Sequence, residues 1–324
     1  MALKIVLLIA GMALLVKGAD WFVSGSSAIA KALKIPSLII GLTLVSMGTS
    51  APEASVSING AVNGMNDLSI GNVVGSNIFN TLLILGVSSL IVPLSVGKDI
   101  KRFDIPVMVG IYGVLLLFAF VITPLKLDIF ESVTMLVLFV AYTAFLIVRA
   151  RKAGKKLAVT GETVTQSPES EEKKKRPVWL NVIFAVVGLA GIIFGGDLVV
   201  DNAAAIAKAA GMSESLVGLT IVAVGTSLPE LVTSVVASIK KENDIAIGNV
   251  IGSNIFNIIF ILGLSSTIST LTLGWVQLID MLVMLGSGII VLLIALFSKK
   301  MWRWQGAVTV LLYVGYLVYI IIRN

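Results

Sequence analysis

Ten apolar stretches, each long enough to cross a lipid bilayer as a helix, dominate the sequence. A spanning helix needs about 20 mostly apolar residues. Stretches of this kind lie at 3–23, 36–62, 69–93, 103–123, 128–149, 178–199, 214–239, 246–269, 274–297 and 303–322. Of the 324 residues, 57% are hydrophobic and only 13% are charged, which is not typical of a soluble domain of this size. The sequence therefore predicts an all-α polytopic membrane protein with ten transmembrane helices, the first of them a retained span rather than a cleaved signal peptide.

The basic residues in the loops predict how the chain is oriented. The loops after spans 1, 3, 5, 7 and 9 carry 19 of the 24 Lys and Arg residues, and the opposite side carries 4. Because short basic loops stay in the cytoplasm, we expect a cell-membrane protein with both termini outside and the polar segment 150–177 inside, as a solvated linker. The net charge of +6 then follows from topology. The lipid bilayer is the expected partner, nucleic acid is not, and no protein partner is inferred.

The two halves of the chain are related by an internal repeat. When residues 18–86 are aligned with 195–263 at an offset of 177, 33 of 69 positions are identical without a gap. Each half has five spans, an odd number, so the second half enters the membrane in the opposite orientation. We expect a first five-helix repeat at 1–149, the linker, and a second, inverted repeat at 178–324. In such folds the substrate site lies near the bilayer midplane, where interrupted helices of the two halves meet.

The first repeated motif, GTSxPE, occurs at 48–53 and again at 225–230. Pro52 and Pro229 lack an N–H and interrupt the helical hydrogen bonds, which exposes carbonyl oxygens beside the hydroxyl groups of the motif. Glu53 and Glu230 add a carboxylate about halfway across each span. An intramembrane acid usually marks an ion or substrate site. The alternative is a proline kink with a neutral Glu that hydrogen-bonds to a neighbouring helix.

The second repeated motif is GNVVGSNIFN at 71–80, which returns as GNVIGSNIFN at 248–257. Polar residues four apart share one helix face in each copy, namely Asn72, Ser76 and Asn80, and Asn249, Ser253 and Asn257. Interhelical hydrogen bonding accounts for Asn72, Asn77, Asn249 and Asn254 as well as cation binding does. For Ser76, Asn80, Ser253 and Asn257, which lie farther along the span, we expect cation binding.

The residue types in the two motifs indicate which ion they suit. The chain contains no Cys and no His, so thiolate and imidazole ligands are excluded. Carboxylate, hydroxyl, amide and carbonyl oxygens suit Ca2+, which takes about 6–8 of them, and Na+, but not Zn2+ or Cu+. Two carboxylates balance the charge of one divalent cation. Without a cation, two like charges would remain in a low dielectric. Continuous occupancy by some cation favours an exchanger over a channel.

The paired motifs resemble those of the cation/Ca2+ antiporter superfamily, and within it the prokaryotic Na+/Ca2+ exchangers. The resemblance covers essentially the whole chain. It implies that spans 2, 3, 7 and 8 form the ion-binding core and that the pair of spans 1 and 6 slides across the rest to give alternating access. It also implies that Na+ and Ca2+ are the transported ions and that no prosthetic group is needed.

The resemblance further implies a role for individual positions. The central Ca2+ ligands correspond to Glu53, Glu230, Thr49 and Thr226. The flanking Na+ ligands correspond to Ser50, Ser76, Ser227 and Ser253, with the backbone of Ser46 and Ala223. Asn80 and Asn257 match a position beside the central site, where K+-dependent relatives carry Asp in one half. Asn in both halves therefore implies K+ independence.

Other functions remain compatible with the residues alone. An H+-coupled antiporter or one of broader divalent specificity would use the same oxygen donors. An intramembrane enzyme could use Glu53 and Glu230 as acid and base, although the repeat gives the two acids equivalent surroundings whereas acid–base catalysis needs different ones. A channel-like or structural membrane protein is the fourth possibility. Asp20 and Asp197, also repeated and near predicted span ends, either guide cations or hold helix ends.

Overall fold

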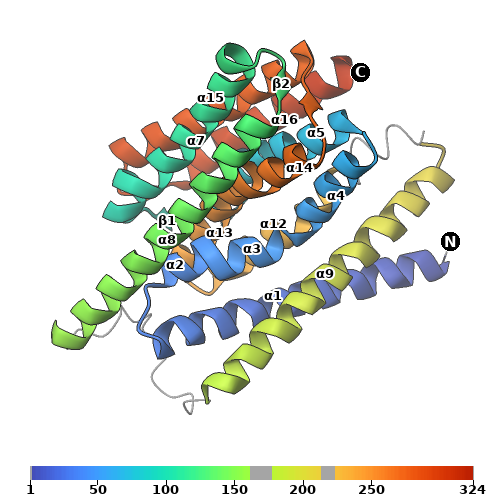
Figure 1. The fold of residues 1–324 in the computed structure, drawn as a ribbon. Helices are drawn as coiled ribbons and strands as arrows, with labels where there is room; N and C mark the ends of the chain where they lie inside the picture. Colours follow the sequence, from blue (N-terminus) through green and yellow to red (C-terminus); the bar gives the residue numbers. More distant parts are fainter. Residues whose placement is uncertain (1, 161–176, 213–222, 324) are drawn as a thin grey trace. The chain divides into compact units, whose positions relative to one another are not determined.

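The computed structural model describes residues 2–160, 177–212 and 223–323, and almost all of its elements are helices (Figure 1). Most of the predicted linker 150–177 and the start of predicted span 214–239 lie outside the described residues. The chain forms two compact units, Met1–Thr49 with Thr143–Asn249, and Ser50–Tyr142 with Val250–Asn324. Each unit therefore takes residues from both halves of the sequence.

The first unit is built around two long helices, α1 and α9. It comprises α1 (Ala2–Ala32), α2 (Ser37–Ile40), the π-helix η1 (Gly41–Val45), α3 (Ser46–Thr49), α9 (Val178–Ala209), α11 (Ala223–Gly225), α12 (Leu228–Ile239) and the start of α13 (Asn243–Phe256). The later part of α8 (Ile129–Thr160) also belongs to it. Phe22, Val23 and Ile192 lie in the apolar core of this unit and are at most 1% exposed.

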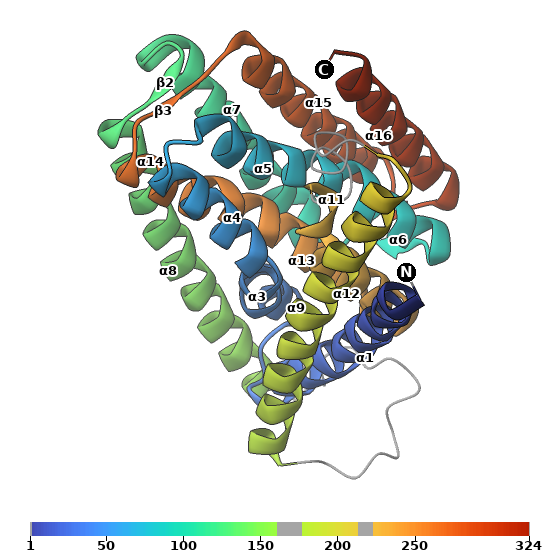
Figure 2. The same ribbon diagram turned by 90° about the vertical axis from the view of Figure 1, so that its right-hand side faces the viewer.

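Glycine allows the backbones of α1 and α9 to approach closely as the helices pass each other in opposite directions (Figures 1 and 2). A Cβ added to Gly188 would clash with the backbone nitrogen of Phe22, and one added to Gly18 would lie 2.7 Å from the carbonyl oxygen of Gly188. Gly11 meets the backbone of Gly195 in the same way. Small residues at such spacing are how helices associate in a membrane, where the hydrophobic effect does not drive packing.

The second unit contains the remaining helices and two pairs of short strands. Its elements are α4 (Ala51–Val62), α5 (Asn66–Ile78), η2 (Phe79–Ile84), α6 (Leu85–Ile91), β1 (Leu94–Ser95), η3 (Ile100–Asp104), α7 (Ile105–Leu117), η4 (Phe118–Ile122), β2 (Lys126–Leu127), η6 (Asn257–Leu262), α14 (Gly263–Ile268), β3 (Leu271–Thr272), α15 (Trp275–Phe297), β4 (Lys300–Met301) and α16 (Arg303–Arg323). β1 pairs antiparallel with β4, with Leu94 opposite Met301, and β2 with β3, with Leu127 opposite Leu271. Each pair joins a strand of the first sequence half to one of the second.

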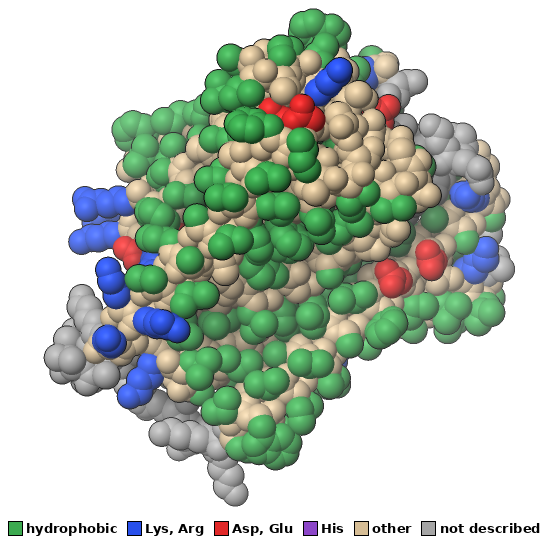
Figure 3. All heavy atoms as spheres, in the orientation of Figure 1, with side chains coloured by type: hydrophobic (Ala, Val, Ile, Leu, Met, Phe, Trp, Pro, Cys, Tyr) green, Lys and Arg blue, Asp and Glu red, His purple; other side chains and the backbone are tan. Residues whose placement is uncertain are grey.

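The described helices fit a membrane protein. Among the described residues, eight helical segments are long and apolar enough to span a bilayer, and Ser37–Thr49 and Leu228–Ile239 are shorter apolar helices. Hydrophobic side chains are spread across the face seen in Figure 3, and Lys and Arg lie toward its margins. The predicted all-helical membrane fold is confirmed at this level. The count of ten spans and the inverted repeat remain predictions.

Among the eight described spans, the two that carry the second motif are the most enclosed. In the most apolar stretch of each span, the buried share is 72% in Asn66–Ile91 and 94% in Asn243–Ile268. In the other six spans it is 11–44%. Helices that face lipid expose apolar side chains, so these two belong to the protein interior. Both change from α- to π-helix at the end of the motif, η2 beginning at Phe79 and η6 at Asn257. Such π-helical turns occur often at functional sites.

Candidate cation-binding site

Each GTSxPE motif interrupts its helix, as the sequence predicts. α3 ends at Thr49 and α4 begins at Ala51, with Ser50 between them at φ −80° and ψ 8°. α11 ends at Gly225 and α12 begins at Leu228, preceded by Ser227 at φ −91° and ψ 6°. In both copies the proline lies at the start of the new helix, where its missing N–H costs no hydrogen bond. The motif therefore starts a new helix rather than kinking a continuous one.

The two acids occupy equivalent and enclosed positions. Glu53 lies in the first turn of α4 and Glu230 in the first turn of α12, and both are 0% exposed. The N-terminal end of a helix carries a partial positive charge, which favours an ionised carboxylate there. A fully buried carboxylate still needs a cation or several donors to offset its lost hydration. The surroundings thus suit a charged group that binds a cation.

A repeated asparagine ties each acid-bearing helix to the helix of the second motif. Asn72 Nδ2 donates to the carbonyl oxygen of Glu53 at 3.1 Å and to Ser57 Oγ at 2.8 Å. At the equivalent positions of the second repeat, Asn249 Nδ2 donates to the carbonyl oxygen of Glu230 at 3.3 Å and to Ser234 Oγ at 2.9 Å. The same contact thus forms in both units. For Asn72 and Asn249 these bonds support the interhelical role over direct cation binding.

In the first unit, Asn249 also links candidate ligands from the two sequence halves. Thr49 Oγ1 donates to Asn249 Oδ1 at 3.0 Å, so Thr49 and the backbone of Glu230 share one fully buried amide. Ser46 and Ser227 belong to the same unit and are at most 1% exposed, and Thr226 is half-buried. Ala223 is the first residue of α11, and its side chain lies outside the described part of the chain.

In the second unit, Asn80 and Asn257 are brought together by two further asparagines. Asn80 Nδ2 donates to Asn254 Oδ1 at 3.2 Å, and Asn257 Nδ2 donates to Asn77 Oδ1 at 3.0 Å. Among the described residues no group donates a hydrogen bond to Asn80 Oδ1 or Asn257 Oδ1, although both atoms are buried. Buried amide oxygens almost always have a partner. These two oxygens are therefore available to a cation.

The remaining candidates of the second unit are also enclosed. Ser50 and Ser253 are 0% exposed and Ser76 is 4% exposed. Through Asn72, Glu53 is connected to α5, which contains Ser76 and leads into η2 with Asn80. Sequence reasoning missed Ser57 and Ser234, which hold the asparagine side chains. A signal was present, because each is identical in the repeat and lies one helical turn after its acid.

Comparison with known proteins finds the same family that the two motifs resemble. The model of the sodium/calcium exchanger protein family matches residues 3–148 and 180–322. The inner membrane protein YrbG of Escherichia coli is 38% identical over 83% of this chain and 81% of its own length. The sodium/calcium exchanger MaX1 of Methanosarcina acetivorans is 33% identical over 96% of this chain and 97% of its own.

Solved structures extend the similarity to the fold. A structure of the sodium-calcium exchanger NCX_Mj is 31% identical and covers 98% of both chains with a TM-score of 0.82. The family match therefore takes in nearly all of the chain, including both copies of each motif. Together with the helical membrane fold and the buried acids, these matches show that the chain belongs to the sodium/calcium exchanger family.

Proposed function

We propose that the protein exchanges Na+ for Ca2+ across the cell membrane by alternating access and does not need K+. One observation carries the proposal: two repeated glutamates, each fully buried in the first turn of a helix that begins within an apolar segment. The names of two similar proteins, the sodium/calcium exchanger MaX1 and the sodium-calcium exchanger NCX_Mj, support the choice of ions.

The transported Ca2+ is bound by Glu53, Glu230, Thr49 and Thr226. Two carboxylates match the charge of one Ca2+, and the threonine hydroxyls supply the hard oxygens that Ca2+ prefers. Na+ is bound at positions that offer hydroxyl or carbonyl oxygens without a carboxylate of their own. These are the side chains of Ser50, Ser76, Ser227 and Ser253 and the backbone of Ser46 and Ala223.

Asn80 and Asn257 lie beside the Ca2+ ligands and contribute neutral amide oxygens. A neutral site adds no charge for a further monovalent cation to balance. The buried amide oxygens described above, which accept no hydrogen bond from the described residues, support this role. They also support exchange without K+.

Transport requires two halves that expose the ions to opposite sides in turn. We assign 1–149 and 178–324 to two inverted five-helix repeats joined by the cytoplasmic linker 150–177, with both termini outside. α1 and α9 move together as one element across the ion-binding helices. The close glycine packing along this pair supports treating it as a single body.

The test is Ca2+ uptake by proteoliposomes loaded with Na+, with external Na+ replaced by K+ or choline. Glu53→Gln and Glu230→Gln remove one carboxylate each, and we expect both to abolish uptake. The matched control is Glu131→Gln. Glu131 is also fully buried in the first turn of a helix, where it accepts a hydrogen bond from the backbone of Asp128, but it lies outside both motifs.

Uptake that needs the Na+ gradient, is independent of external K+ and survives in the control supports the proposal. Uptake that follows a pH gradient instead would replace Na+ by H+ as the coupling ion. Uptake of Mn2+ or Sr2+ in competition with Ca2+ would indicate a broader divalent specificity. Absence of uptake under every gradient, in protein that remains folded, would overturn the exchanger proposal.

A further inference from the structure

We propose that Asn77 and Asn254 are positioning residues, which hold the amides of Asn80 and Asn257 so that their oxygen atoms, and not their NH2 groups, are presented to the cation. The proposal rests on the proposed function, in which Asn80 and Asn257 lie beside bound Ca2+. It assigns a role to two residues whose side chains are not themselves ligands.

An asparagine ligand has an orientation problem that a carboxylate lacks. One end of its amide is an acceptor and the other end is a donor, and the two are nearly the same size. If the amide flipped so that its two ends changed places, a cation ligand would become a group that repels the cation. A neutral site built from Asn80 and Asn257 therefore needs other groups that fix each amide.

The two hydrogen bonds of the Asn77 side chain form the first arm of the asparagine network, and a backbone carbonyl fixes their direction. Asn77 Nδ2 donates to the backbone carbonyl of Asn254 at 3.1 Å, and a carbonyl can only accept. The Oδ1 of Asn77 must therefore point the other way, where it accepts from Asn257 Nδ2 at 3.0 Å. That bond turns the donor end of Asn257 toward Asn77 and leaves its Oδ1 as the end available to a cation.

The second arm runs in the opposite direction. Asn254 Nδ2 donates to Thr81 Oγ1 at 2.9 Å and to Met108 Sδ at 3.4 Å, which leaves Asn254 Oδ1 to accept from Asn80 Nδ2 at 3.2 Å. Asn80 Oδ1 is then the end available to a cation. Thr81 has no counterpart in the repeat, because Ile258 stands at the equivalent position. The anchor of this arm is thus a side chain that mutation can remove.

Ordinary interhelical hydrogen bonding would use the same four asparagines, so the test must separate orientation from stability. A carboxylate at position 80 has two acceptor oxygens and no donor end, so it presents oxygen in either orientation. Asn254→Ala should therefore raise the KM for Ca2+ about 10- to 100-fold in the natural background, as loss of outer-shell contacts to metal ligands does. In an Asn80→Asp background the same substitution should leave KM within about twofold.

The control is Ser57→Ala, which removes a partly buried hydrogen bond from Asn72 between α4 and α5 but does not touch the four asparagines. It should change KM by the same factor in both backgrounds. Asn77→Ala, combined with Asn257→Asp, tests the first arm in the same way. If Asn254→Ala does not fold, Thr81→Val keeps the side-chain shape and removes the hydroxyl that anchors Asn254, together with the contact of that hydroxyl to the Tyr112 hydroxyl, and is subject to the same comparison.

An equal effect of Asn254→Ala, or of Thr81→Val in its place, on KM in both backgrounds would overturn the proposal, because a packing role does not depend on residue 80. An unchanged KM in the natural background would overturn it as well. Ca2+-induced thermal stabilisation of the purified protein gives a second readout. It should disappear in Asn254→Ala and return in the double variant with Asn80→Asp.

The two proposals can fail separately. If the unmodified protein transports no Ca2+ against Na+, the proposed function fails. Thermal stabilisation by Ca2+, Sr2+ or Mn2+ then still tests the orientation of the amides, because it needs cation binding but no exchange. If exchange is present and the two backgrounds respond alike, only the positioning role fails.

Discussion

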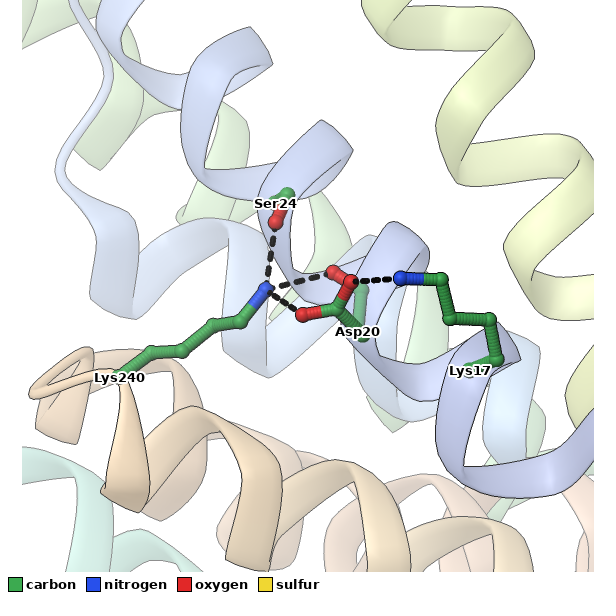
Figure 4. Close-up of polar contacts among 4 residues, drawn as sticks. All are labelled: Lys17, Asp20, Ser24 and Lys240. Carbon is green, nitrogen blue, oxygen red and sulfur yellow. Dashed lines mark hydrogen bonds and ion pairs between the residues drawn. The ribbon is translucent and has the colours of Figure 1, made fainter. Parts of the chain in front are cut away.

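The helices α1 and α9 contain the same stretch of the two sequence repeats, yet their polar surroundings differ. Asp20 of α1 is paired with Lys240, whose Nζ lies 2.5 Å from Oδ1, and with Lys17 at 3.3 Å (Figure 4). Lys240 also donates to Ser24 Oγ at 2.6 Å. Asp197 is the equivalent of Asp20 in α9, and in the described part of the chain it has no basic partner. Among the described residues, this kind of contact is therefore seen for the Asp20 position of α1 and not for the equivalent position of α9.

A second acid–base contact extends the difference. Ser27 donates to Glu242 Oε1 at 2.6 Å, and Lys31 lies 3.7 Å from the same atom. Lys240 and Glu242 correspond to Asn63 and Met65 in the first half of the repeat, which carry no charge. The duplication thus preserved the oxygen donors of both motifs and changed the charged contacts of α1. Two halves that share both motifs therefore differ in the charged contacts around them.

The largest expected effect tests whether the two acids are equivalent. Glu53→Gln and Glu230→Gln should each lower Ca2+ uptake by at least about 100-fold, because each removes a charge that bound Ca2+ must have. The losses of uptake in the two variants should agree within a few-fold when initial rates are measured over a range of Ca2+ concentrations. If one variant kept most of its activity, the equivalence of the two halves would be wrong at the ligands themselves.

The next effect concerns the packing that α1 and α9 share. Gly188→Ala should lower the free energy of unfolding by about 1–3 kcal/mol, because its Cβ would meet backbone atoms of Phe22 and Gly18. The matched control is Gly196→Ala on the same helix, whose Cβ would meet side-chain carbons at 3.8 Å and 3.9 Å. Thermal unfolding in detergent measures both. Equal stability of the two variants would contradict the close backbone packing.

A smaller effect should again be symmetric. Ser57→Ala and Ser234→Ala each remove one hydrogen bond to the repeated asparagine, and each should destabilise the protein by about 1 kcal/mol. Thermal unfolding of the two variants, with and without Ca2+, measures both losses of stability. A large difference between the two would show that the equivalent bonds contribute unequally.

The smallest expected effect should differ between the two repeats. Asp20→Asn removes the contact to Lys240, and Asp197→Asn is its matched control in α9. The Lys240 and Asp20 side chains are 28% and 37% exposed, so we expect a contribution of at most about 1 kcal/mol, or up to about a fivefold change in exchange rate. Asp197→Asn should leave the rate unchanged.

The charge pair itself can be isolated with a double variant. Because Asp20→Asn and Lys240→Gln both remove this contact, their effects on the rate should be less than additive in the double variant. High salt should reduce the difference between the natural protein and Asp20→Asn. Equal responses of Asp20→Asn and Asp197→Asn would mean that the contact does not distinguish α1 from α9.

The sequence predicted the features that depend on local chemistry. Apolar length indicates the spans, and proline with its neighbouring hydroxyls indicates the helix interruptions at Ser50 and Ser227, because both follow from hydrogen-bonding rules within one segment. Helix ends were less accurate. The predicted spans 3–23 and 178–199 continue to Ala32 and Ala209, since the repeated AIAKA segment favours helix beyond the apolar stretch.

The features that depend on distant partners were not predicted. Asp20, expected near the end of a span, lies well inside α1, which ends at Ala32, and its partner Lys240 comes from the other half of the sequence. The loop charge of Lys240 indicated orientation but not its contact. Likewise, spacing along one helix could not decide whether Asn77 binds a cation or another asparagine, because the answer depends on Asn254 of a different helix.

Each compact unit is assembled from both halves of the sequence, and both strand pairs of the second unit join one half to the other. Neither half can therefore complete a core by itself. A protein cleaved within 150–177 should therefore remain associated as one complex, and two separately expressed halves should assemble in the membrane. If the two halves are inverted repeats, as proposed above, a gene that encoded a single half before the duplication would have needed to insert its product in both directions and to function as a pair of oppositely oriented copies.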